Sequence, residues 1–417
     1  MLKDSILFQE INYLYDLYSK KCIDYTFKKK RRIKEQKLTV VFIAQYIPAW
    51  NKFEPIFAAM EADSRFNPIL LCVPMDLSDQ EKKKPGIKEN KVYNFFIGQG
   101  YEAINAISVD GRWRSLKDLN PDYIFQTRPY DYLLPEPYKA RRSKYYALNC
   151  NVMYGPNLAR GFYDTVWNDS YFRNVFCYFS LDKDEMTEFN FFFSKKNGRS
   201  EHRCFPFGGT GLADILSYKP MKKKLGKFSK RVLWTPRWST DSMIGGSNFF
   251  RYKSWFFEMA QAFPKVEFVV RPHPLMFDNF IHTGEMTESE VENFKSACRS
   301  APNIRLDQSG EYAEMLWSSD IMVSDISGIM IEYAITKQPL VYCKSDIEWD
   351  IVPSAQRLLN ANYIANCKEE LFEVTKQLLE GMDEKKHLRN EVVDDLYGDI
   401  SLHSNKILDC LWRLIYE

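Results

Sequence analysis

Histidine is scarce in this sequence and cysteine is never clustered: five histidines occur in 417 residues, and the nine cysteines stand singly along the chain. No Cys-x-x-Cys pair and no short-spaced group of cysteine and histidine is present. This excludes a recognisable zinc site and a disulfide framework, and it is typical of a reduced compartment. No stretch reaches the roughly 18 consecutive apolar residues of a membrane-spanning helix, and the first residues lack the charged-then-apolar order of a secretory signal. We therefore expect a cytoplasmic protein without a structural metal.

An excess of charge of either sign is also lacking, because 57 lysines and arginines balance 55 aspartates and glutamates to a net charge of +2. A general nucleic-acid-binding protein is therefore not expected. With 45% hydrophobic and 27% charged residues, the chain is neither disordered nor of low complexity. Its length predicts about two to three packed domains.

The first 37 residues differ from the rest, because they hold ten basic residues against five acidic ones. Residues 28–32 form a basic run. The apolar residues that precede this run recur at helical spacing: Ile6, Leu7, Ile11, Leu14, Tyr15 and Tyr18. Such a helix is typical of two situations. It can pack on the domain behind it with a solvated outer face, or it can lie on an anionic membrane surface.

The rest of the chain alternates short apolar segments with helical ones, which is the pattern of α/β domains. Strands are predicted at residues 38–46, 67–73 and 123–126, and a second series at 232–235, 266–271, 321–324 and 340–343. The second series follows a basic segment that contains Pro220 and Gly226 and no acidic residue.

We predict a helical extension at 1–37, a first Rossmann-like domain at 38–218, a linker at 219–231, a second Rossmann-like domain at 232–400 and a C-terminal helix at 401–417. Two doubly wound α/β domains that face each other across a cleft are common in enzymes that use nucleotide donors. Their ligands lie at the carboxyl ends of the strands.

Three strings in the second domain place polar residues directly after a predicted strand. In the first string these residues are Thr235 and Arg237. A guanidinium at a strand end suits a bidentate phosphate contact. The alternative for Arg237 is an ordinary surface ion pair.

The second string holds Arg271 and His273, with the histidine between Pro272 and Pro274. The two prolines fix the backbone on either side of the imidazole. A ring held beside an arginine at a strand terminus is suited to meet phosphate oxygens or to transfer a proton. The alternative is a loop histidine with no role in chemistry.

The third string follows residues 321–324 and contains Asp325, Ser327, Gly328 and Glu332. We expect Ser327 to cap a helix that runs to about residue 336. The amides of residues 327–329 would then form an anion site for a diphosphate. Glu332 would accept hydrogen bonds from the hydroxyls of a ribose. The alternative is an ordinary capped helix with a solvated glutamate.

These strings together resemble the CDP-glycerol glycerophosphotransferase family of teichoic-acid and capsule synthesis, in which corresponding strings occur in the same order. The resemblance covers about residues 38–350 and is strongest in the last third. The matching strings are "LWTPRW", "RPHP", "SDISGIMIEYAITKQPLVY", "FPFGGTGLAD", "WNKFEPIFAAMEADSRFNPILLCVP" and "PDYIFQTRPYD".

The resemblance implies a two-domain GT-B-like fold, with the acceptor bound by the first domain and the CDP-linked donor by the second. It implies transfer of glycerol phosphate, or a related polyol phosphate, to a hydroxyl of a lipid-linked precursor at the cytoplasmic face of the membrane, with release of CMP. The implied roles are phosphate contacts for Arg271 and His273, diphosphate binding by Ser327 and Gly328, and orientation of that loop by Asp325.

Two departures from the family pattern stand out. Glu332 occupies a position where many members have aspartate. Well-studied members have a His-Gly pair in the first domain as the proposed base, and the matching region here, residues 147–157, holds no histidine. The candidates for the base are then Asp131, Asp164 and Asp169, whereas Tyr154 and Asn157 are candidates for binding acceptor or donor.

Three hypotheses follow. The first is a peripheral membrane polyol-phosphate transferase, with residues 1–36 on the anionic surface. The second is a glycosyltransferase that uses a nucleotide sugar on the same scaffold. The third is a catalytically silent scaffold, suggested by the absent histidine. No cofactor or protein-bound metal is required, although a divalent cation such as Mg²⁺ can accompany the diphosphate.

Overall fold

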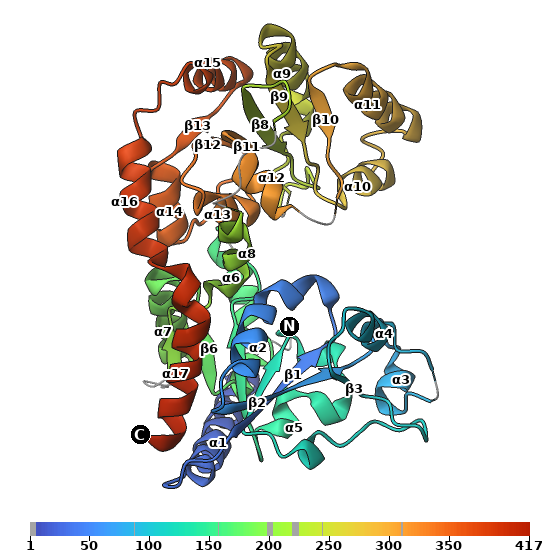
Figure 1. The fold of residues 1–417 in the computed structure, drawn as a ribbon, viewed down its shortest axis with the longest axis vertical. Helices are drawn as coiled ribbons and strands as arrows, with labels where there is room; N and C mark the ends of the chain where they lie inside the picture. Colours follow the sequence, from blue (N-terminus) through green and yellow to red (C-terminus); the bar gives the residue numbers. More distant parts are fainter. Residues whose placement is uncertain are drawn as a thin grey trace. The chain divides into compact units, whose positions relative to one another are not determined.

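The computed structural model describes residues 6–86, 88–156, 158–197, 203–218, 225–243, 245–309 and 312–417. The chain folds into two compact units, whose elements are labelled in Figure 1. The first unit contains Met1–Tyr154, Tyr163–Ala213 and Asp399–Glu417, and the second contains Gly155–Phe162 and Asp214–Gly398. Residues 219–224 of the predicted linker lie outside the described residues.

A seven-stranded parallel sheet forms the centre of the first unit, in the order β3-β2-β1-β4-β5-β6-β7 (Figure 1). The central strand β1 is buried at every residue except Thr39, as expected for a strand covered on both faces. The strands are β1 Leu38–Ala44, β2 Phe66–Cys72, β3 Ala103–Asn105, β4 Tyr123–Gln126, β5 Leu148–Val152, β6 Cys177–Phe179 and β7 Arg203–Phe205.

In the described part of the chain, the α-helices of the first unit include α6, which crosses the boundary to the second unit, and α8, which begins at that boundary. They are α1 Ile6–Lys30, α2 Glu54–Glu61, α3 Asp79–Lys83, α4 Lys91–Gly98, α5 Ala140–Ser143, α6 Arg160–Trp167, α7 Lys183–Asn197, α8 Ala213–Ser217 and α17 His403–Tyr416.

The second unit has a six-stranded parallel sheet in the order β10-β9-β8-β11-β12-β13. Its strands are β8 Lys230–Thr235, β9 Val266–Val270, β10 Ile304–Leu306, β11 Ile321–Ser324, β12 Leu340–Cys343 and β13 Tyr363–Ala365. Its helices are α9 Phe249–Ala262, α10 Met276–His282, α11 Glu288–Ser300, α12 Ala313–Ser318, α13 Ile329–Ala334, α14 Pro353–Asn360, α15 Lys368–Leu379 and α16 Lys386–Tyr397.

The predicted fold class, two doubly wound Rossmann-like domains, is confirmed. In each sheet the chain first builds outward on one side of the central strand and then continues on the other side. The strand order therefore reverses between β1 and β4 in the first unit and between β8 and β11 in the second. In open parallel sheets, ligands bind outside the carboxyl ends of the strands at such a reversal. The three predicted motifs of the second domain follow β8, β9 and β11, so they lie at the carboxyl ends of the strands beside this reversal.

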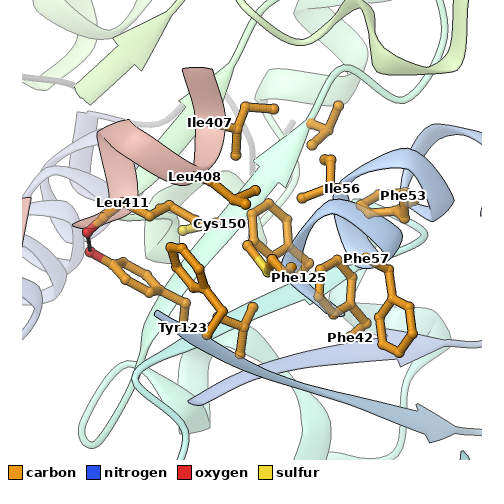
Figure 2. Close-up of a cluster of buried hydrophobic side chains, with 14 of the residues drawn as sticks. Phe42, Phe53, Ile56, Phe57, Tyr123, Phe125, Cys150, Ile407, Leu408 and Leu411 are labelled. Atoms are coloured by element: carbon orange, nitrogen blue, oxygen red, sulfur yellow. Dashed lines mark hydrogen bonds between the residues drawn. The ribbon is translucent and has the colours of Figure 1, made fainter. Parts of the chain in front are cut away.

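One segment lies in a different unit from its predicted domain, and the C-terminal helix, predicted outside both domains, lies in the first unit. Residues 155–162 belong to the second unit, because the Arg160 N–H donates to the Asp350 carbonyl over 2.8 Å and the Val352 N–H to the Leu158 carbonyl over 2.9 Å. The helix α17 belongs to the first unit. Figure 2 shows Ile407, Leu408 and Leu411 of α17 pointing into the aromatic core of that unit.

Aromatic rings build the core that α17 covers. The rings of Phe42 and Phe125 stack with their centroids 5.1 Å apart, and Phe42 and Phe57 meet edge to face at 5.3 Å (Figure 2). The Tyr123 hydroxyl donates a 2.8 Å hydrogen bond to the Leu411 carbonyl (Figure 2). A buried tyrosine thus has its polar end satisfied by the helix that covers it, as such side chains require.

The helix α1 packs on the first unit through Ile23 and Phe27 and also through several polar residues, which differs from a purely apolar buried face. Asp16, Ser19 and Thr26 are buried, and Lys144 donates a 2.8 Å hydrogen bond to Ser19. The outward stripe carries part of the predicted apolar face, because Ile11, Leu14 and Tyr18 are 54–62% exposed, and Tyr25 lies beside them at 59%. The apolar spacing therefore predicted the helix but not the side that faces the protein. Within the described residues, no helix combines the length and the apolar composition needed to span a bilayer.

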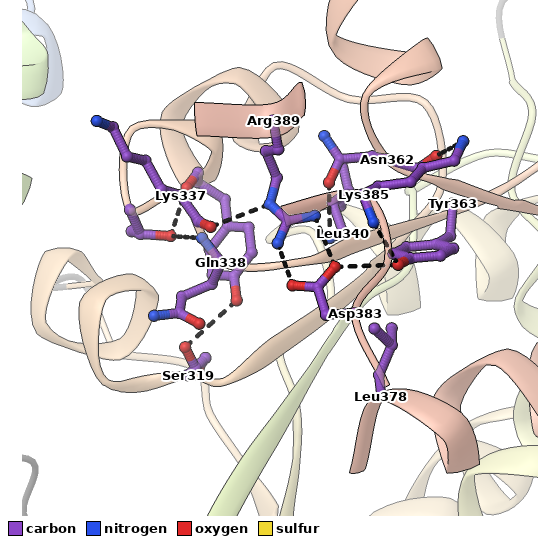
Figure 3. Close-up of polar contacts among 12 residues, drawn as sticks. Ser319, Lys337, Gln338, Leu340, Asn362, Tyr363, Leu378, Asp383, Lys385 and Arg389 are labelled. Atoms are coloured by element: carbon purple, nitrogen blue, oxygen red, sulfur yellow. Dashed lines mark hydrogen bonds and ion pairs between the residues drawn. The ribbon is translucent and has the colours of Figure 1, made fainter. Parts of the chain in front are cut away.

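A buried arginine ties α16 to the second sheet. Arg389 is 1% exposed, pairs with Asp383 and donates to the Lys337 carbonyl over 3.0 Å (Figure 3). The same aspartate accepts a 3.0 Å hydrogen bond from the Tyr363 hydroxyl (Figure 3). Lys337 itself has φ +60°, a conformation rare for a residue with a side chain. The guanidinium therefore holds the chain reversal that leads into β12.

Candidate functional site

Asp325 organises the reversal point of the second sheet. Its carboxylate accepts the N–H of Arg237 at 2.8 Å, the N–H of Asn248 at 3.2 Å and the side-chain amide of Asn248 at 3.0 Å. Burial raises the pKa of this carboxyl to about 6, although the three hydrogen bonds act in the opposite direction. A carboxylate that is 1% exposed and bound in this way holds other residues in place. Asp325 thus holds the main chain at Arg237 and Asn248 in place, and its implied role in orienting the loop stays a prediction.

Arg237 leaves the end of β8 and is held from several sides. Its guanidinium donates to the Ile326 carbonyl over 2.7 Å. It also lies over the rings of Phe162 and Trp349, at 5.7 and 5.9 Å from their centroids. Burial lowers the pKa of this arginine, but arginine stays charged at any physiological pH. The side chain is thus a cation fixed at the strand end, and the alternative of an ordinary surface ion pair does not describe it.

His273 is oriented by its own loop. Its N–H donates to the Pro236 carbonyl over 3.2 Å, and its ring Nδ1 accepts the N–H of Leu275 over 3.2 Å. Because Nδ1 is an acceptor, the neutral ring carries its proton on Nε2. Burial, and then the charge of Arg237, lower the pKa of His273. At neutral pH this residue therefore offers a fixed, uncharged Nε2–H donor at the carboxyl end of the sheet.

Arg271 and Thr235 are engaged within the protein. The Arg271 guanidinium pairs with Asp307 at 2.5 Å and donates to the Ser309 carbonyl over 2.8 Å. The Thr235 hydroxyl donates to the Ser324 hydroxyl over 2.8 Å and is 5% exposed. Both residues thus fix neighbouring segments, and their direct contact with a donor stays a prediction.

The predicted cap at Ser327 is wrong. Gly328 is the N-cap of α13, it has helical backbone angles, and no side chain caps this helix. The helix also ends at Ala334, short of the expected residue 336. Ser327 instead contributes its carbonyl, which accepts the Met330 N–H over 3.1 Å. Serine is common at the residue before a helix, which is why the sequence predicted Ser327 as the cap. The helix starts one residue later than this pattern predicted, and helix ends are commonly misplaced by one or two residues.

Gly328 permits a close approach between two segments of the second unit. A Cβ at this position would lie 2.6 Å from the Pro156 carbonyl oxygen, closer than any side chain tolerates. In the part of the chain that the structure describes, the N–H groups of Ser327 and Gly328 have no hydrogen-bond acceptor. Glu332 lies half-buried on the first turn of α13.

A cavity beside Asn248 was not predicted from the sequence. It has a volume of about 630 Å³ and is lined by loop residues after β8 and β12, among them Thr240, Gly246, Ser345 and Glu348. Its size is typical of small-molecule sites. The sequence signal is the run Gly245, Gly246, Ser247 and Asn248 directly before α9. Gly246 has φ +88°, and a Cβ there would lie 3.2 Å from the Trp349 ring.

The acceptor-side candidates are spread over the first unit and its boundary. Tyr154 follows β5, and its ring lies 6.0 Å from that of Tyr130. Burial raises the pKa of Tyr154. Asn157 lies outside the described residues. Asp164 is half-exposed on α6, where its main-chain carbonyl accepts a hydrogen bond from Asn168.

The two remaining candidates for the base differ in their surroundings. Asp131 is buried and accepts the N–H of Ala140 at 2.8 Å and that of Arg141 at 3.3 Å, so it holds the start of α5. Burial raises its pKa to about 6. Asp169 accepts the Tyr171 N–H over 2.8 Å, is only half-buried, and also has its pKa raised by burial.

Arg128 at the reversal point of the first sheet was also missed. Its guanidinium lies 4.0 Å from the centroid of the Tyr46 ring, and no carboxylate among the described residues lies within 4 Å of it. The Thr127 hydroxyl oxygen accepts the N–H of Gln45 over 3.1 Å, which joins the loops after β1 and β4. The sequence signal was an Arg-Pro pair close behind a strand: Arg128-Pro129 follows β4 after one residue, and Arg271-Pro272 follows β9 directly. Among the described residues, no group of three or more His, Cys, Asp or Glu side chains is arranged to hold a metal ion.

Known proteins resemble this chain in one sequence segment and in the fold. Residues 215–394 match the family described as CDP-Glycerol:Poly(glycerophosphate) glycerophosphotransferase, which confirms the resemblance for the segment that carries the three motifs. No curated protein matches the sequence of the chain.

Solved structures share the fold at low sequence identity. UDP-GlcNAc 2-epimerase from Neisseria meningitidis is 14% identical, with a TM-score of 0.60 over 91% of this chain and 100% of that chain. The wall teichoic acid polymerase TagF is 14% identical, with a TM-score of 0.54 over 97% of this chain and 98% of that chain. A UDP-N-acetylglucosamine 2-epimerase reaches a TM-score of 0.62 at 14% identity, over 92% of this chain and 97% of that chain.

Proposed function

We propose that this chain, whose residues 215–394 carry the CDP-glycerol glycerophosphotransferase domain, is a transferase of that kind. It moves glycerol phosphate, or a related polyol phosphate, from a CDP-linked donor to a hydroxyl of a cell-surface polymer precursor. The observation that carries the proposal is the position of Arg237, His273 and Ser327-Gly328 directly after β8, β9 and β11, around the reversal point of the second sheet. A fixed cation, a neutral N–H donor and two unengaged amides suit a diphosphate.

In the proposed reaction the acceptor hydroxyl oxygen attacks the phosphorus that bears the glycerol. The bond from this phosphorus to the bridging oxygen breaks, and CMP leaves with the electron pair. The charge that develops on the leaving phosphate is stabilised by Arg237 and by the Nε2–H of His273, which are already in place before the reaction. Asp325 keeps the Arg237 loop in position. The family resemblance assigns the ribose of the donor to Glu332.

The hydroxyl proton must pass to a base of the first unit. Asp131 is 2% exposed and holds the start of α5 through two main-chain N–H groups, whereas Asp169 is half-buried. We therefore favour Asp169 over Asp131, with Asp164 as the remaining candidate. Replacement of each by asparagine, measured as CMP release, tests this choice. The base is the residue whose loss abolishes turnover but leaves donor affinity unchanged.

Nucleotide release tests the proposed function. The purified chain is given CDP-glycerol, CDP-ribitol, UDP sugars and GDP sugars, each with a crude lipid-linked acceptor extract. CMP from one CDP-polyol is the expected product. That a divalent cation accompanies the donor diphosphate stays a prediction, and assays without Mg²⁺ test it.

A nucleotide-sugar transferase is the second candidate, favoured by the fold shared with UDP-GlcNAc 2-epimerases. Release of a nucleoside diphosphate would support it. Donor binding without turnover would support a silent scaffold.

Membrane association is a further part of the proposal. The outer stripe of α1 exposes Ile11, Leu14 and Tyr18, and it continues into exposed lysines, Lys21 and Lys28. Apolar side chains beside a basic run suit the interface of an anionic bilayer, at the cytoplasmic face where a lipid-linked acceptor would lie.

Replacement of both Ile11 and Leu14 by glutamate is expected to weaken binding to phosphatidylglycerol vesicles at least tenfold, because each apolar side chain contributes about 1.5–3 kcal/mol when buried. Co-sedimentation measures the effect. Val109→Glu, on a residue that is 94% exposed elsewhere in the first unit, is the matched control. Undiminished binding of the double variant would place the membrane contact elsewhere.

Arg128 is the proposed contact for a phosphate of the acceptor. Its guanidinium is held in place by the Tyr46 ring and has no carboxylate partner among the described residues. A phosphate that binds there therefore does not have to displace a carboxylate from the arginine. Arg128→Gln is expected to raise the KM for the acceptor roughly tenfold to a hundredfold, because a hydrogen bond to a charged group contributes about 1.5–3 kcal/mol. Binding of CDP-glycerol should not change. Arg112→Gln, on a highly exposed arginine, is the control, and an unchanged KM in Arg128→Gln would contradict the assignment.

A further inference from the structure

A second cavity lies in the first unit, between the end of α1, strand β7 and the last turns of α17. Its volume is about 590 Å³, within the range of small-molecule sites. None of the residues discussed so far as donor, acceptor or base contacts lines it. Phe27, Phe205, Phe207 and Leu414 form its apolar wall, and all four are half-buried. The cavity is therefore partly open, with an apolar wall made mainly of phenylalanine rings.

Four cations and two acids also line this cavity, but they are not equivalent. Asp409 pairs at 2.9 Å with Arg65, which is not a lining residue. Arg31 donates to the main-chain oxygen of Glu417 over 2.6 Å, and Arg413 lies 3.8 Å from the side-chain carboxylate of Glu417. These contacts account for both acids and for two of the cations.

Arg203 and Lys406 remain. Neither has a carboxylate within 4 Å among the described residues, although Lys406 lies near enough to Asp399 to help lower the pKa of that residue. The Arg203 guanidinium lies on one side of a pair of contacting rings, 4.5 Å from the centroid of Phe27 and 4.3 Å from that of Phe176, whose centroids are 5.0 Å apart. The Lys406 ammonium lies 5.6 Å from the centroid of Phe207. Contact with aromatic rings does not use the N–H groups of a guanidinium, which can therefore bind an anion.

We propose that this cavity binds an anionic amphiphile, a single alkyl or acyl chain that ends in a phosphate or carboxylate. The apolar chain lies against Phe205, Phe207 and Leu414, where it removes exposed aromatic surface from water. The anionic end meets Arg203 and Lys406, the two cations without a carboxylate partner. This binding does not depend on the transfer reaction, and its ligand chemistry follows from the wall and the charges alone.

The test uses isothermal titration calorimetry of the full chain with decyl phosphate, decan-1-ol and inorganic phosphate, each below its aggregation limit. One decyl phosphate is expected to bind per chain, at least tenfold more tightly than either of the other two compounds. Equal binding of decan-1-ol would show that the cations play no part, and equal binding of inorganic phosphate would show that the apolar wall plays none. Either result overturns the proposal.

Variants locate the binding. Lys406→Gln and Phe207→Ala are each expected to weaken decyl phosphate binding at least fivefold, and Arg203→Gln at least tenfold. Lys406 is exposed, so its replacement remains informative where the loss of Arg203 from its contact with two rings disturbs folding. Arg112→Gln is the control and should bind as the parent chain does. Undiminished binding in Lys406→Gln and Phe207→Ala would place the ligand elsewhere and overturn the proposal.

Discussion

Replacement of His273 by alanine is expected to lower CMP release from CDP-glycerol by about a hundredfold to a thousandfold, the usual loss when one pre-positioned donor to a developing negative charge is removed. The reason is specific to this ring. Its Nδ1 is occupied by the Leu275 N–H, so Nε2–H is the group that can face a phosphate. Its pKa is lowered by burial and by Arg237, so the ring acts as a neutral donor at pH 7.

A kinetic comparison separates this role from general damage. The alanine variant should lose kcat more than donor affinity, because the hydrogen bond strengthens as charge moves to the leaving phosphate. His282→Ala provides the control, since His282 is exposed at the end of the nearby helix α10. If His273→Ala changes neither donor affinity nor turnover, the donor site is not at the carboxyl end of β9.

Replacement of Arg389 by leucine is expected to destabilise the second unit by about 3–5 kcal/mol, the usual cost of removing one partner of a buried ion pair. The arginine is 1% exposed, and its loss leaves the Lys337 carbonyl without this donor and the Asp383 carboxylate with the Tyr363 hydroxyl but without its cation. Because domains are stable by only about 5–15 kcal/mol, a lower melting temperature and a lower yield of folded protein should both be evident.

Two further variants test whether the loss of stability comes from the buried ion pair. Arg357→Leu removes an exposed pair with Asp395 and should cost less than about 1 kcal/mol. The double variant Arg389→Leu with Asp383→Leu should recover part of the loss, since no unpaired buried charge remains. Thermal unfolding of the three variants is compared with the parent chain. If Arg389→Leu lowers the stability no more than Arg357→Leu does, the buried Arg389–Asp383 pair does not hold the second unit together as proposed.

The site shows where local sequence patterns stop being informative. The run of apolar residues before Asp325 and the Pro-His-Pro string were enough to place these residues after strands, because parallel strands bring their carboxyl ends to one edge. The partners of the charged groups were not predictable. Arg271 pairs with Asp307, 36 residues away, and Asp325 accepts the Arg237 N–H from 88 residues away.

Some departures have equally definite causes. The spacing of apolar residues in α1 predicted a helix, but with Asp16, Ser19 and Thr26 buried, Ile11, Leu14 and Tyr18 of the predicted apolar face are exposed. The helix at the end of the chain was predicted, yet only its contacts with Phe125 and Tyr123 place it in the first unit. Arg128 follows a strand as Arg271 does, but only the ring of Tyr46 and the absence of a carboxylate nearby distinguish it.

The sequence by itself determined the α/β class, the two series of strands, the order of the motifs and the family resemblance, because these depend on residue type and on spacing along the chain. The tertiary structure decided which charged groups hold the protein together and which remain open to a ligand. In the folded chain, Asp325 accepts hydrogen bonds from Arg237 and Asn248, and Arg271 forms an ion pair with Asp307. The His273 ring uses Nδ1 within its own loop, so its Nε2–H is the group available to a ligand. The physical reason is that a charge is satisfied by whatever lies within a few ångströms, and only the packed chain fixes those neighbours.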